Sequence, residues 1–283
     1  MICVEEATPA TFEEALPLLV GFENPKIQRE QWRSLFHYSW PWGNEARGFA
    51  LRDGARLAGF FGTIWSDRNF EGRAERICNI TSWITLPEYR HASLRLLQAI
   101  LDLKDCTITC HSPAPHLYPL YQRLGFQDLE TKVCVLLPPP SARLGLRYRV
   151  ISDLSKMAHW LQGDDERILR AHRPHACGHL LVLGSDDYCY LVYSKTKGKR
   201  THFSHIHYIS NREVFVRALD RIKLALFRVT RTPFLMLDGR LAAGLEVPFR
   251  REAVLRTPHV YRSATQAPPP IDNLYSELIL LGL

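Results

Sequence analysis

Hydrophobic positions recur with two different periods along the first half of the chain. Apolar residues three and four positions apart predict amphipathic helices, whereas β-branched or apolar runs bounded by turn residues predict strands. The predicted helices are 11–22, 28–40, 93–103 and 117–124. The predicted strands are 48–52, 56–65, 76–86 and 106–110, followed by a strand pair over 126–137. This order mixes helices with a sheet and predicts an α/β (α+β) fold.

Glycines mark two of the boundaries between these elements. Asp53-Gly54 is a dipeptide typical of a hairpin turn between two strands, and Gly125 supplies the left-handed residue that ends the helix of LYPLYQRLGF. The leucines of that helix form its apolar stripe. Its two tyrosines, Tyr118 and Tyr121, are left without a structural explanation.

The second half repeats the same order of elements with different residues. A strand and a helix follow residue 146, and three antiparallel strands joined by turns lie within 178–210. A single long amphipathic helix is predicted over 211–229, and a short buried strand over 232–238. The ending NLYSELILL (273–281) predicts one more strand.

A proline run divides the two halves. Three prolines at 138–140, followed by SARLG, are typical of a linker. We therefore predict a domain over 1–137, a linker over 138–145 and a second domain over 146–283, related by an internal duplication.

Composition limits the class of protein. The chain has 283 residues, of which 46% are hydrophobic and 23% charged, as in a globular protein. No apolar run approaches the length of a membrane span, and the N-terminus lacks the pattern of a signal peptide. Seven cysteines without CxxC spacing favour reduced thiols and a cytoplasmic location.

The basic charge narrows the possible partners only slightly. A net charge of +7 favours anionic partners, which include phosphorylated cofactors and nucleic acid. The excess of Lys and Arg is spread along the chain, and the dense cluster KTKGKR (195–200) is interpreted as a solvated hairpin turn. Charge therefore does not single out one anionic partner, and we expect neither nucleic acid nor a membrane.

The chain contains twelve histidines, a residue type that commonly binds metal ions. The segment HRPHACGH (172–179) contains three histidines and a cysteine, but their spacing matches no familiar zinc site. His205 and His207 alternate along a predicted strand and share one face, where they would line a pocket. We predict no metal site.

The order of elements, together with YQRLGF at 121–126, resembles the GCN5-related N-acetyltransferase (GNAT) superfamily, whose members commonly carry Y-x-x-L-G-F at this place. The resemblance covers 1–137 well and 146–283 loosely. It implies two GNAT-like domains, each a mixed, mostly antiparallel sheet flanked by helices. It also implies an acyl-CoA-dependent N-acyltransferase that moves an acyl group from acetyl-CoA or another acyl-CoA to an amine of a small molecule or sugar.

The resemblance also implies where the coenzyme would bind. In that family the thioester arm lies where the central strand, here Ile77–Thr85, splays from its parallel neighbour, and the next helix N-terminus holds the pyrophosphate. Arg90 matches the family loop, but Ser93 and Arg95 stand where glycines are usual. The implied cofactor-binding residues are Ile84, Thr85, Arg90, His91, Ala92, Ser93, Leu94 and Arg95.

Acyl transfer to an amine benefits from a base for the amine and an acid for the leaving thiolate. Tyr121 occupies the position where members of the family frequently carry the general acid, and Tyr118 is predicted to contact the substrate nearby. If Tyr121 does not act as the acid, it is a core residue. Glu75 and His111 are the other catalytic candidates, although each also fits a polar strand end. Asn79, Thr81 and Trp83 are predicted to contact substrate.

Alternative functions remain open at this point. The glycine-poor loop also fits a non-catalytic acyl-CoA-binding or assembly module, and the paired domains also resemble FemAB-type aminoacyl transferases, which carry a helical arm absent here. The second half, whose loop is YISNREVFVRAL, is interpreted as a pocket wall rather than a second active site. The small-molecule acceptor is not identified, and the chain is expected to be a monomer or homodimer.

Overall fold

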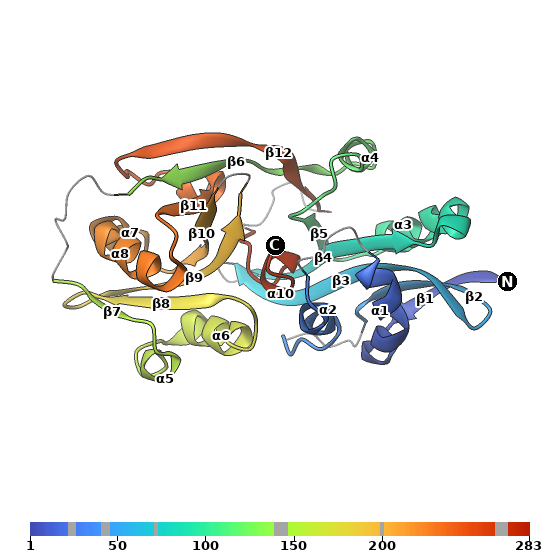
Figure 1. Cartoon of the computed structure of the whole chain (residues 1–283), viewed down its shortest axis with the longest axis horizontal. Coiled ribbons are helices and arrows are strands. Elements are labelled where there is room, and N and C mark those ends of the chain that lie inside the picture. The colour runs from blue at the N-terminus through green and yellow to red at the C-terminus, as the bar shows by residue number, and fades with distance from the viewer. Residues whose placement is uncertain (22–26, 41–45, 71–72, 139–146, 199–200, 264–270) are drawn as a thin grey trace.

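The computed structural model describes residues 1–21, 27–40, 46–70, 73–138, 147–198, 201–263 and 271–283. Within them, hydrogen bonds join twelve strands into one mixed sheet with helices packed against it (Figure 1). The order of the strands across the sheet is β1-β2-β3-β4-β5-β12-β6-β11-β10-β9-β8-β7. The predicted α/β class is confirmed.

The elements of the first half follow the predicted order. Its helices are η1 (Pro9–Thr11), α1 (Phe12–Val20), α2 (Arg29–Phe36), η2 (Pro87–Ala92), α3 (Ser93–Leu101) and α4 (Tyr118–Arg123). Its strands are β1 (Ile2–Ala7), β2 (Gly48–Asp53), β3 (Arg56–Phe70), β4 (Arg73–Thr85), β5 (Thr107–Cys110) and β6 (Gln127–Leu136).

The second half contains a similar succession of helices and strands. Its helices are α5 (Leu154–Met157), α6 (Gly163–His172), α7 (Arg212–Arg217), α8 (Leu219–Thr230), α9 (Gly239–Ala242) and α10 (Glu277–Leu280). Its strands are β7 (Arg149–Ile151), β8 (Gly178–Leu183), β9 (Tyr188–Lys197), β10 (His202–Ile209), β11 (Phe234–Asp238) and β12 (Arg250–Arg262). In both halves an antiparallel meander leads into a parallel pair, which is β4–β5 in the first and β10–β11 in the second.

The two halves exchange their last strands. Strand β6 of the first half pairs with β11 of the second, and β12 of the second half pairs with β5 of the first. The two exchanged strands also pair with each other, so they run side by side across the top of Figure 1. Backbone hydrogen bonds therefore continue from one half into the other without a break.

One hydrophobic cluster also crosses between the halves. It contains Trp32 and Phe36 of α2, Leu169 of α6 and Ile279 of α10, each at most 5% exposed. Burial of such large apolar side chains is a main stabilising contribution. Helix α10 and the C-terminus consequently lie in the middle of the molecule (Figure 1).

Three sequence-based assignments were wrong in detail. Residues 126–137 form the single strand β6, because the polar middle of that segment sits at a shift in the β6–β12 register rather than in a turn. The predicted helix over 211–229 is divided at Ala218 into α7 and α8. The C-terminal segment forms α10 rather than a strand, and its residues from Asn273 to Leu281 are all buried.

The reason for the last error is general. A short apolar run that is buried on all sides has no periodicity to separate helix from strand.

Other predicted features are confirmed: Gly54 (φ +58°) and Gly125 (φ +82°) adopt the left-handed conformation expected for a hairpin turn and a helix end. The predicted linker 138–145 lies almost wholly outside the described residues. No described helix is long and apolar enough to cross a membrane.

The strand exchange predicts that the protein unfolds as one unit. Separating the halves would expose both edges of β6 and one edge of β5, and such edges promote aggregation. We expect a single cooperative thermal transition for the full chain and an aggregating product when the chain is cut after residue 137. Differential scanning calorimetry of the full chain checks the first expectation. Two well-separated transitions, one for each half, would contradict it.

Candidate active site

The parallel strands β4 and β5 separate in the middle of the sheet. They pair from Ile77–Thr107 to Asn79–Thr109, and β4 then continues to Thr85 without a further partner on β5. A bulge follows at once, because Ser82 adopts φ +56° and the pairing of β4 with β3 shifts there. The edge of β4 that faces β5 therefore has no partner among the described strands beyond Asn79, and this separation of the two strands is here called the opening.

The C-terminal helix places a carboxylate at this opening. The backbone N–H of Glu277 donates to Asn79 Oδ1 at 2.9 Å, and Glu277 Oε1 accepts from the backbone N–H of His111 at 2.8 Å. The hydroxyl of Ser112 donates to the same oxygen at 2.9 Å. Asn79 is fixed in turn by Thr109, through hydrogen bonds from its Nδ2. Glu277 is thus attached to the ends of both strands.

The environment of Glu277 changes its acidity. Its side chain is fully buried, and burial raises the pKa of Glu277 to about 7 against the opposing hydrogen bonds from Ser112 and His111. Its second oxygen, Oε2, is buried and has no hydrogen-bond partner within the described chain. A carboxyl group whose pKa lies near 7 is suited to accept and release a proton at neutral pH.

Tyr121 lies on the buried side of α4, close to the same opening. It is 3% exposed, its ring contacts Phe126 with centroids 5.1 Å apart, and its phenol has no hydrogen-bond partner among the described residues. Burial raises the pKa of Tyr121, and the neighbouring Cys110 and Glu277 raise it further. The phenol therefore stays protonated and is a potential proton donor.

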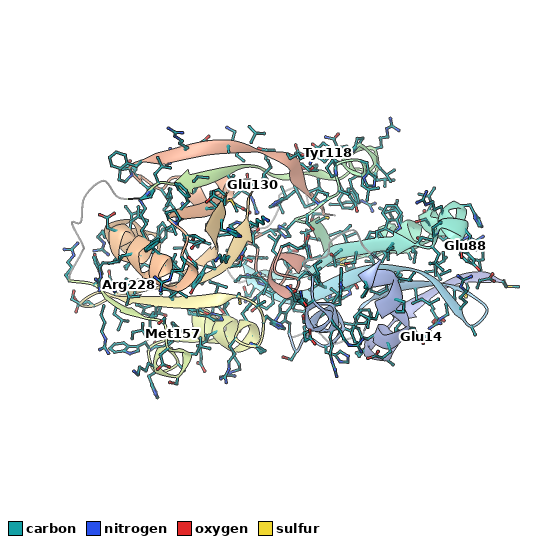
Figure 2. All side chains as sticks on the ribbon, viewed as in Figure 1. Glu14, Glu88, Tyr118, Glu130, Met157 and Arg228 are labelled. Carbon is teal, nitrogen blue, oxygen red and sulfur yellow. The ribbon has the colours of Figure 1, made fainter. Side chains whose placement is uncertain are left out.

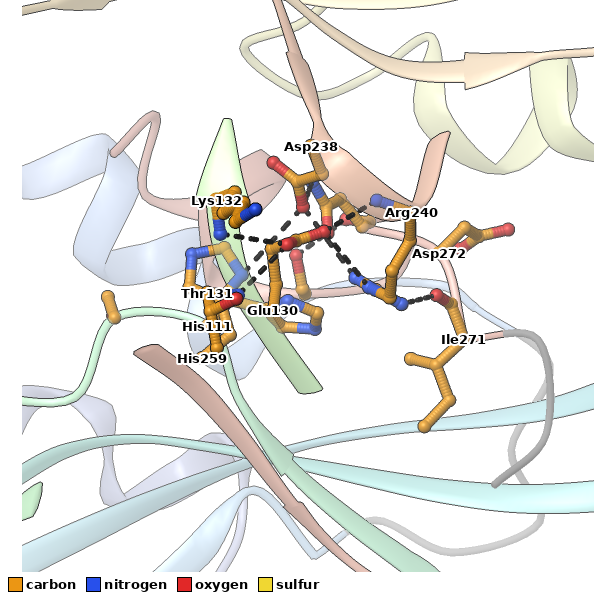
Figure 3. A network of polar contacts seen from close by, with 12 residues as sticks. His111, Glu130, Thr131, Lys132, Asp238, Arg240, His259, Ile271 and Asp272 are labelled. Carbon is orange, nitrogen blue, oxygen red and sulfur yellow. Dashed lines mark hydrogen bonds and ion pairs between the residues drawn. The ribbon is translucent and has the colours of Figure 1, made fainter. Parts of the chain in front are cut away.

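A network of buried polar side chains connects this opening to the second half (Figure 3). The rings of His111 and His259 meet edge to face with centroids 5.3 Å apart, and His259 Nδ1 lies 3.8 Å from Asp238 Oδ2. Asp238 also accepts from His205 Nε2 at 3.1 Å and from Asn273 Nδ2 at 2.7 Å. The ends of β5 and β11 thus face each other across His259 of the exchanged strand β12.

His111 and His259 are uncharged at neutral pH. Burial lowers the pKa of His259 to about 4, and burial together with the neighbouring His259 lowers the pKa of His111 well below its ordinary value. Burial alone would favour the protonated form of Asp238, but the hydrogen bond from His205 holds the pKa of Asp238 below its usual range. The network therefore contains an ionised carboxylate close to the neutral imidazole of His259.

No protein-family model matches the sequence, and no curated protein matches it. Solved structures do match. A GCN5-related N-acetyltransferase from Anabaena variabilis aligns over 93% of this chain and 72% of its own, with 11% identity and a TM-score of 0.60. A protein of unknown function from Enterococcus faecalis, described as a probable N-acyltransferase, covers the same shares with 13% identity and a TM-score of 0.61. A candidate acetyltransferase from Pyrococcus horikoshii aligns over 96% of this chain and 92% of its own, with 13% identity and a TM-score of 0.54.

The chain has the GNAT fold. At these identities the likeness concerns the fold, and it confirms the family resemblance at that level. The opening between β4 and β5, with its bulge at Ser82, corresponds to the predicted splay of the GNAT fold.

The loop that follows β4 in this GNAT fold is only partly free to meet an anion. Ser93, the first residue of α3, does not cap the helix; its hydroxyl accepts from Trp83 Nε1 at 2.9 Å and lies 3.0 Å from Thr85 Oγ1. Arg95 points away, since its guanidinium donates to the carbonyl of Ile2 at 2.8 Å. Arg90 and His91 are exposed at the end of η2.

The remaining predicted loop residues are placed as follows. Ile84 and Thr85 pair with Phe60 and Gly59 of β3. Ala92 is buried beneath the loop at 3% exposure, whereas Leu94 is 61% exposed.

The predicted substrate contacts fall into two groups. Asn79 and Thr81 lie on β4 beside the opening, and Trp83 stacks on Phe61 with centroids 5.1 Å apart. Tyr118 lies at the outer end of α4, where Figure 2 marks it, and its hydroxyl donates to Asp128 at 2.7 Å. Tyr118 is therefore occupied by a surface contact.

The structure does not bring Glu75 to the opening. Glu75 precedes Asn79 by four residues on β4, which places it roughly 13 Å away along the strand. Asn79 and His111 are joined through Glu277, and Tyr121 lies near enough for Glu277 to raise the pKa of its phenol. The only sequence signal for Glu277 was a lone acidic residue in the apolar ending LYSELILL.

The other loops of the second half have structural roles. Asn211 caps α7, accepting from the backbone N–H of Val214 at 3.1 Å, and Arg212 donates to the carbonyls of Leu241 and Ala243. His172 packs against Trp40 and Tyr275. Within the described residues, no group of three or more His, Cys, Asp or Glu side chains is placed to hold a metal ion.

The raised pKa of Glu277 predicts a pH-dependent stability. The folded state holds this proton more tightly than the unfolded state, so the ionised carboxylate destabilises the fold progressively as pH rises from about 4.5 to about 7. Glu277→Gln keeps Oε1 as an acceptor and removes the ionisation. Relative to wild type, we expect this variant to gain up to roughly 3 kcal/mol between pH 4.5 and pH 8. Urea unfolding at a series of pH values measures the difference, and a difference that does not change with pH would contradict the assignment.

Proposed function

We propose that the protein is an acyl-CoA-dependent N-acyltransferase that moves an acyl group, acetyl or longer, from the coenzyme A thioester to an amine of a small molecule or sugar. The observation that carries the proposal is the position of Tyr121 and Glu277, two groups that can donate or accept a proton, near the place where β4 and β5 of a GNAT fold stop pairing. The location is proposed to be the cytoplasm, since all seven cysteines are free thiols.

The two groups suit the two proton movements of the reaction. Acyl-CoA would supply the activated acyl group. Glu277 Oε2, which has no hydrogen-bond partner in the described chain, accepts the proton of the acceptor amine, directly or through a water. The Tyr121 phenol donates a proton to the sulfur that leaves. Asn79, His111 and Ser112 hold Glu277 at the strand ends while this happens.

The residues present fit one part of the coenzyme better than the other. Beyond Asn79, the edge of β4 that faces β5 has no strand partner in the described part of the chain and fits an extended thioester arm. The arm would form hydrogen bonds with this edge like those of a neighbouring strand. At the phosphate end the cation available is the exposed Arg90, because Ser93 and Arg95 are engaged within the protein. Charge would therefore replace the backbone contacts that glycines usually allow.

A non-catalytic acyl-CoA-binding module is the second candidate. It is favoured by the same engagement of Ser93 with Trp83 and Thr85, which leaves this hydroxyl unavailable to a phosphate. The two candidates share binding and differ in turnover. The proposed acceptor is a small molecule, and neither nucleic acid nor a membrane is part of either proposal.

The proton-transfer roles predict two strongly impaired variants. Tyr121→Phe and Glu277→Gln should each lower kcat by roughly 10²–10⁴-fold, since each removes a general acid or base. Glu277→Gln should also abolish the rise in rate near pH 7. Tyr118→Phe is the matched control, and a change of less than about threefold is expected because its hydroxyl contacts Asp128 and Gln122 at the surface.

The readout is thiol release from acetyl-CoA and longer acyl-CoAs across a panel of amines. If acyl-CoA binds but no amine in the panel releases thiol, and the tyrosine and glutamate variants bind unchanged, the non-catalytic module is supported. If no thioester binds, both candidates are wrong.

The loop geometry predicts which cation holds the coenzyme. Arg90→Ala should weaken acetyl-CoA binding about tenfold, because an exposed guanidinium at this loop is free to pair with phosphate. Arg95→Ala is the control with the same charge removed, and it should leave affinity within about threefold, because Arg95 is bonded to Ile2. Calorimetric titration with acetyl-CoA measures both. Equal losses would show that only general charge matters.

A further inference from the structure

Residues 271–283 form the C-terminal segment that carries the candidate base, and an ion pair with little exposure to water ties this segment to β3. The guanidinium of Arg68 donates from Nη1 to Asp272 Oδ1 at 2.9 Å and from Nη2 to Asp272 Oδ2 at 2.7 Å. The two side chains are 12% and 20% exposed. Such a two-pronged contact fixes both position and orientation, which a solvated surface ion pair does not.

Arg68 also contacts an aromatic ring of the same segment. Its guanidinium carbon lies 4.6 Å from the ring centroid of Tyr275 and 5.1 Å from that of Phe70. A cation over an aromatic ring is attracted by it, and the attraction is stronger where water is excluded. One side chain of β3 therefore holds the turn after Asp272 at two places.

This turn has an unfavourable backbone conformation. Tyr275 adopts φ +57°, which is uncommon for a residue other than glycine. Asp272 Oδ1 accepts from the backbone N–H of Leu274 at 2.9 Å, and His172 Nε2 accepts from the backbone N–H of Tyr275 at 3.3 Å. Such a conformation persists only where its surroundings hold it, and Glu277 follows two residues later.

The segment is held separately beyond Glu277. The side chains of Gln31 and Ser34 on α2 donate to the carbonyls of Leu281 at 2.6 Å and Leu280 at 3.2 Å. These contacts do not involve the turn that Arg68 holds. A change at Arg68 should therefore release the stretch before Glu277 while α10 stays packed against α2.

The acidity of Glu277 reports how closely this stretch is held. The titratable groups that face it are Cys110 and His111, from β5 and its end, and Tyr121 from α4. Burial raises the pKa of Cys110 and of Tyr121 and lowers the pKa of His111, so all three are uncharged at neutral pH. Burial, rather than a neighbouring charge, is therefore what raises the pKa of Glu277 to about 7.

We propose that Arg68 is a positioning residue of the active site: its contacts with Asp272 and Tyr275 hold the turn that keeps the Glu277 carboxyl at the ends of β4 and β5 and away from water. The inference rests on the proposed role of Glu277 as the base of the reaction. Arg68 acts through the backbone between Asp272 and Glu277. An ion pair that contributes stability alone would leave Glu277 unchanged in the folded protein.

The test measures the pKa of Glu277 in the full-length folded protein without substrate. Protein labelled with ¹³C at the glutamate carboxyl groups is titrated by NMR, and the resonance of Glu277 is the one missing from Glu277→Gln. In Arg68→Met the pKa of Glu277 should fall by at least about one pH unit, because water reaches the carboxyl. A pKa that rises or stays within about 0.3 pH units of the wild-type value overturns the proposal, as does an ordinary glutamate pKa in the wild-type protein.

A second variant tests the other half of the ion pair. Asp272→Asn removes the charge and keeps the oxygen that accepts from Leu274, so the turn keeps its own hydrogen bond. The pKa of Glu277 should fall in this variant too. If circular dichroism shows that Arg68→Met is unfolded, Asp272→Asn decides the question, and an unchanged pKa in it overturns the proposal.

Arg52→Met is the matched control for the loss of a well-packed arginine. Arg52 of β2 is 16% exposed and pairs with Glu5 and Glu14, neither of which belongs to the C-terminal segment. Whatever it does to the unfolding temperature, this variant should leave the pKa of Glu277 within about 0.3 pH units of wild type. Equal falls in the two arginine variants would show a general loss of stability and overturn the proposal.

The kinetic consequence is separable from the proposed function. In a protein that transfers acyl groups, the pH at which kcat is half-maximal should fall in Arg68→Met together with the pKa of Glu277, because a more acidic base is deprotonated at lower pH. If the wild-type protein transfers no acyl group, the proposed function fails. The NMR titration then still decides whether Arg68 positions Glu277.

Discussion

The exchange of β6 and β12 is the constraint on which the rest of this structure depends. Because β12 pairs with β5, it carries His259 to the end of the first-half strand pair, next to His111. The same path leads the chain to residues 271–283, so α10 enters the centre and sets Glu277 at the opening between β4 and β5. Without the exchange, the first half would have the opening and Tyr121 but no buried carboxylate beside them.

Much of the fold was readable from local patterns. The hairpin at Asp53-Gly54, the strand over 76–86 and the helix that ends at Gly125 each depend on residues close together in the sequence, and each is confirmed. The assignment failed for the C-terminal segment, where burial on every side hides the period that separates helix from strand. It also failed for 211–229, where Ala218 divides an otherwise continuous apolar stripe.

Only part of the candidate site could be predicted from the sequence, because local patterns do not indicate contacts between distant segments. His111 and Tyr121 follow the strand and helix signals of one half, so their proximity could be predicted from the order of elements. Glu277 is contributed from the far end of the chain, 166 residues from His111, and no local pattern indicates that contact. Glu75 was the acidic residue that the first half itself offered, but it lies at the wrong end of β4. Asp238 had a weak signal as the charged residue that ends the buried strand FLMLD.

The two strand ends use the same architecture with opposite electrostatics. At the first, burial outweighs the hydrogen bonds to Glu277 and raises the pKa of its carboxyl to about 7, which suits proton exchange at neutral pH. At the second, the hydrogen bond from His205 keeps the pKa of the buried Asp238 carboxyl below its usual range. Two carboxyl groups of different acidity thus lie on either side of His111 and His259.

The central claim is that the opening between β4 and β5 holds the thioester beside Tyr121 and Glu277. A crystal structure with a non-hydrolysable acyl-CoA analogue tests it most directly. The account predicts that the analogue's arm runs along β4 beyond Asn79, with its sulfur position within hydrogen-bond reach of the Tyr121 hydroxyl and Arg90 at the phosphates. An analogue bound elsewhere on the protein, with Ser93 still closed on Trp83 and Glu277 out of its reach, would contradict the account.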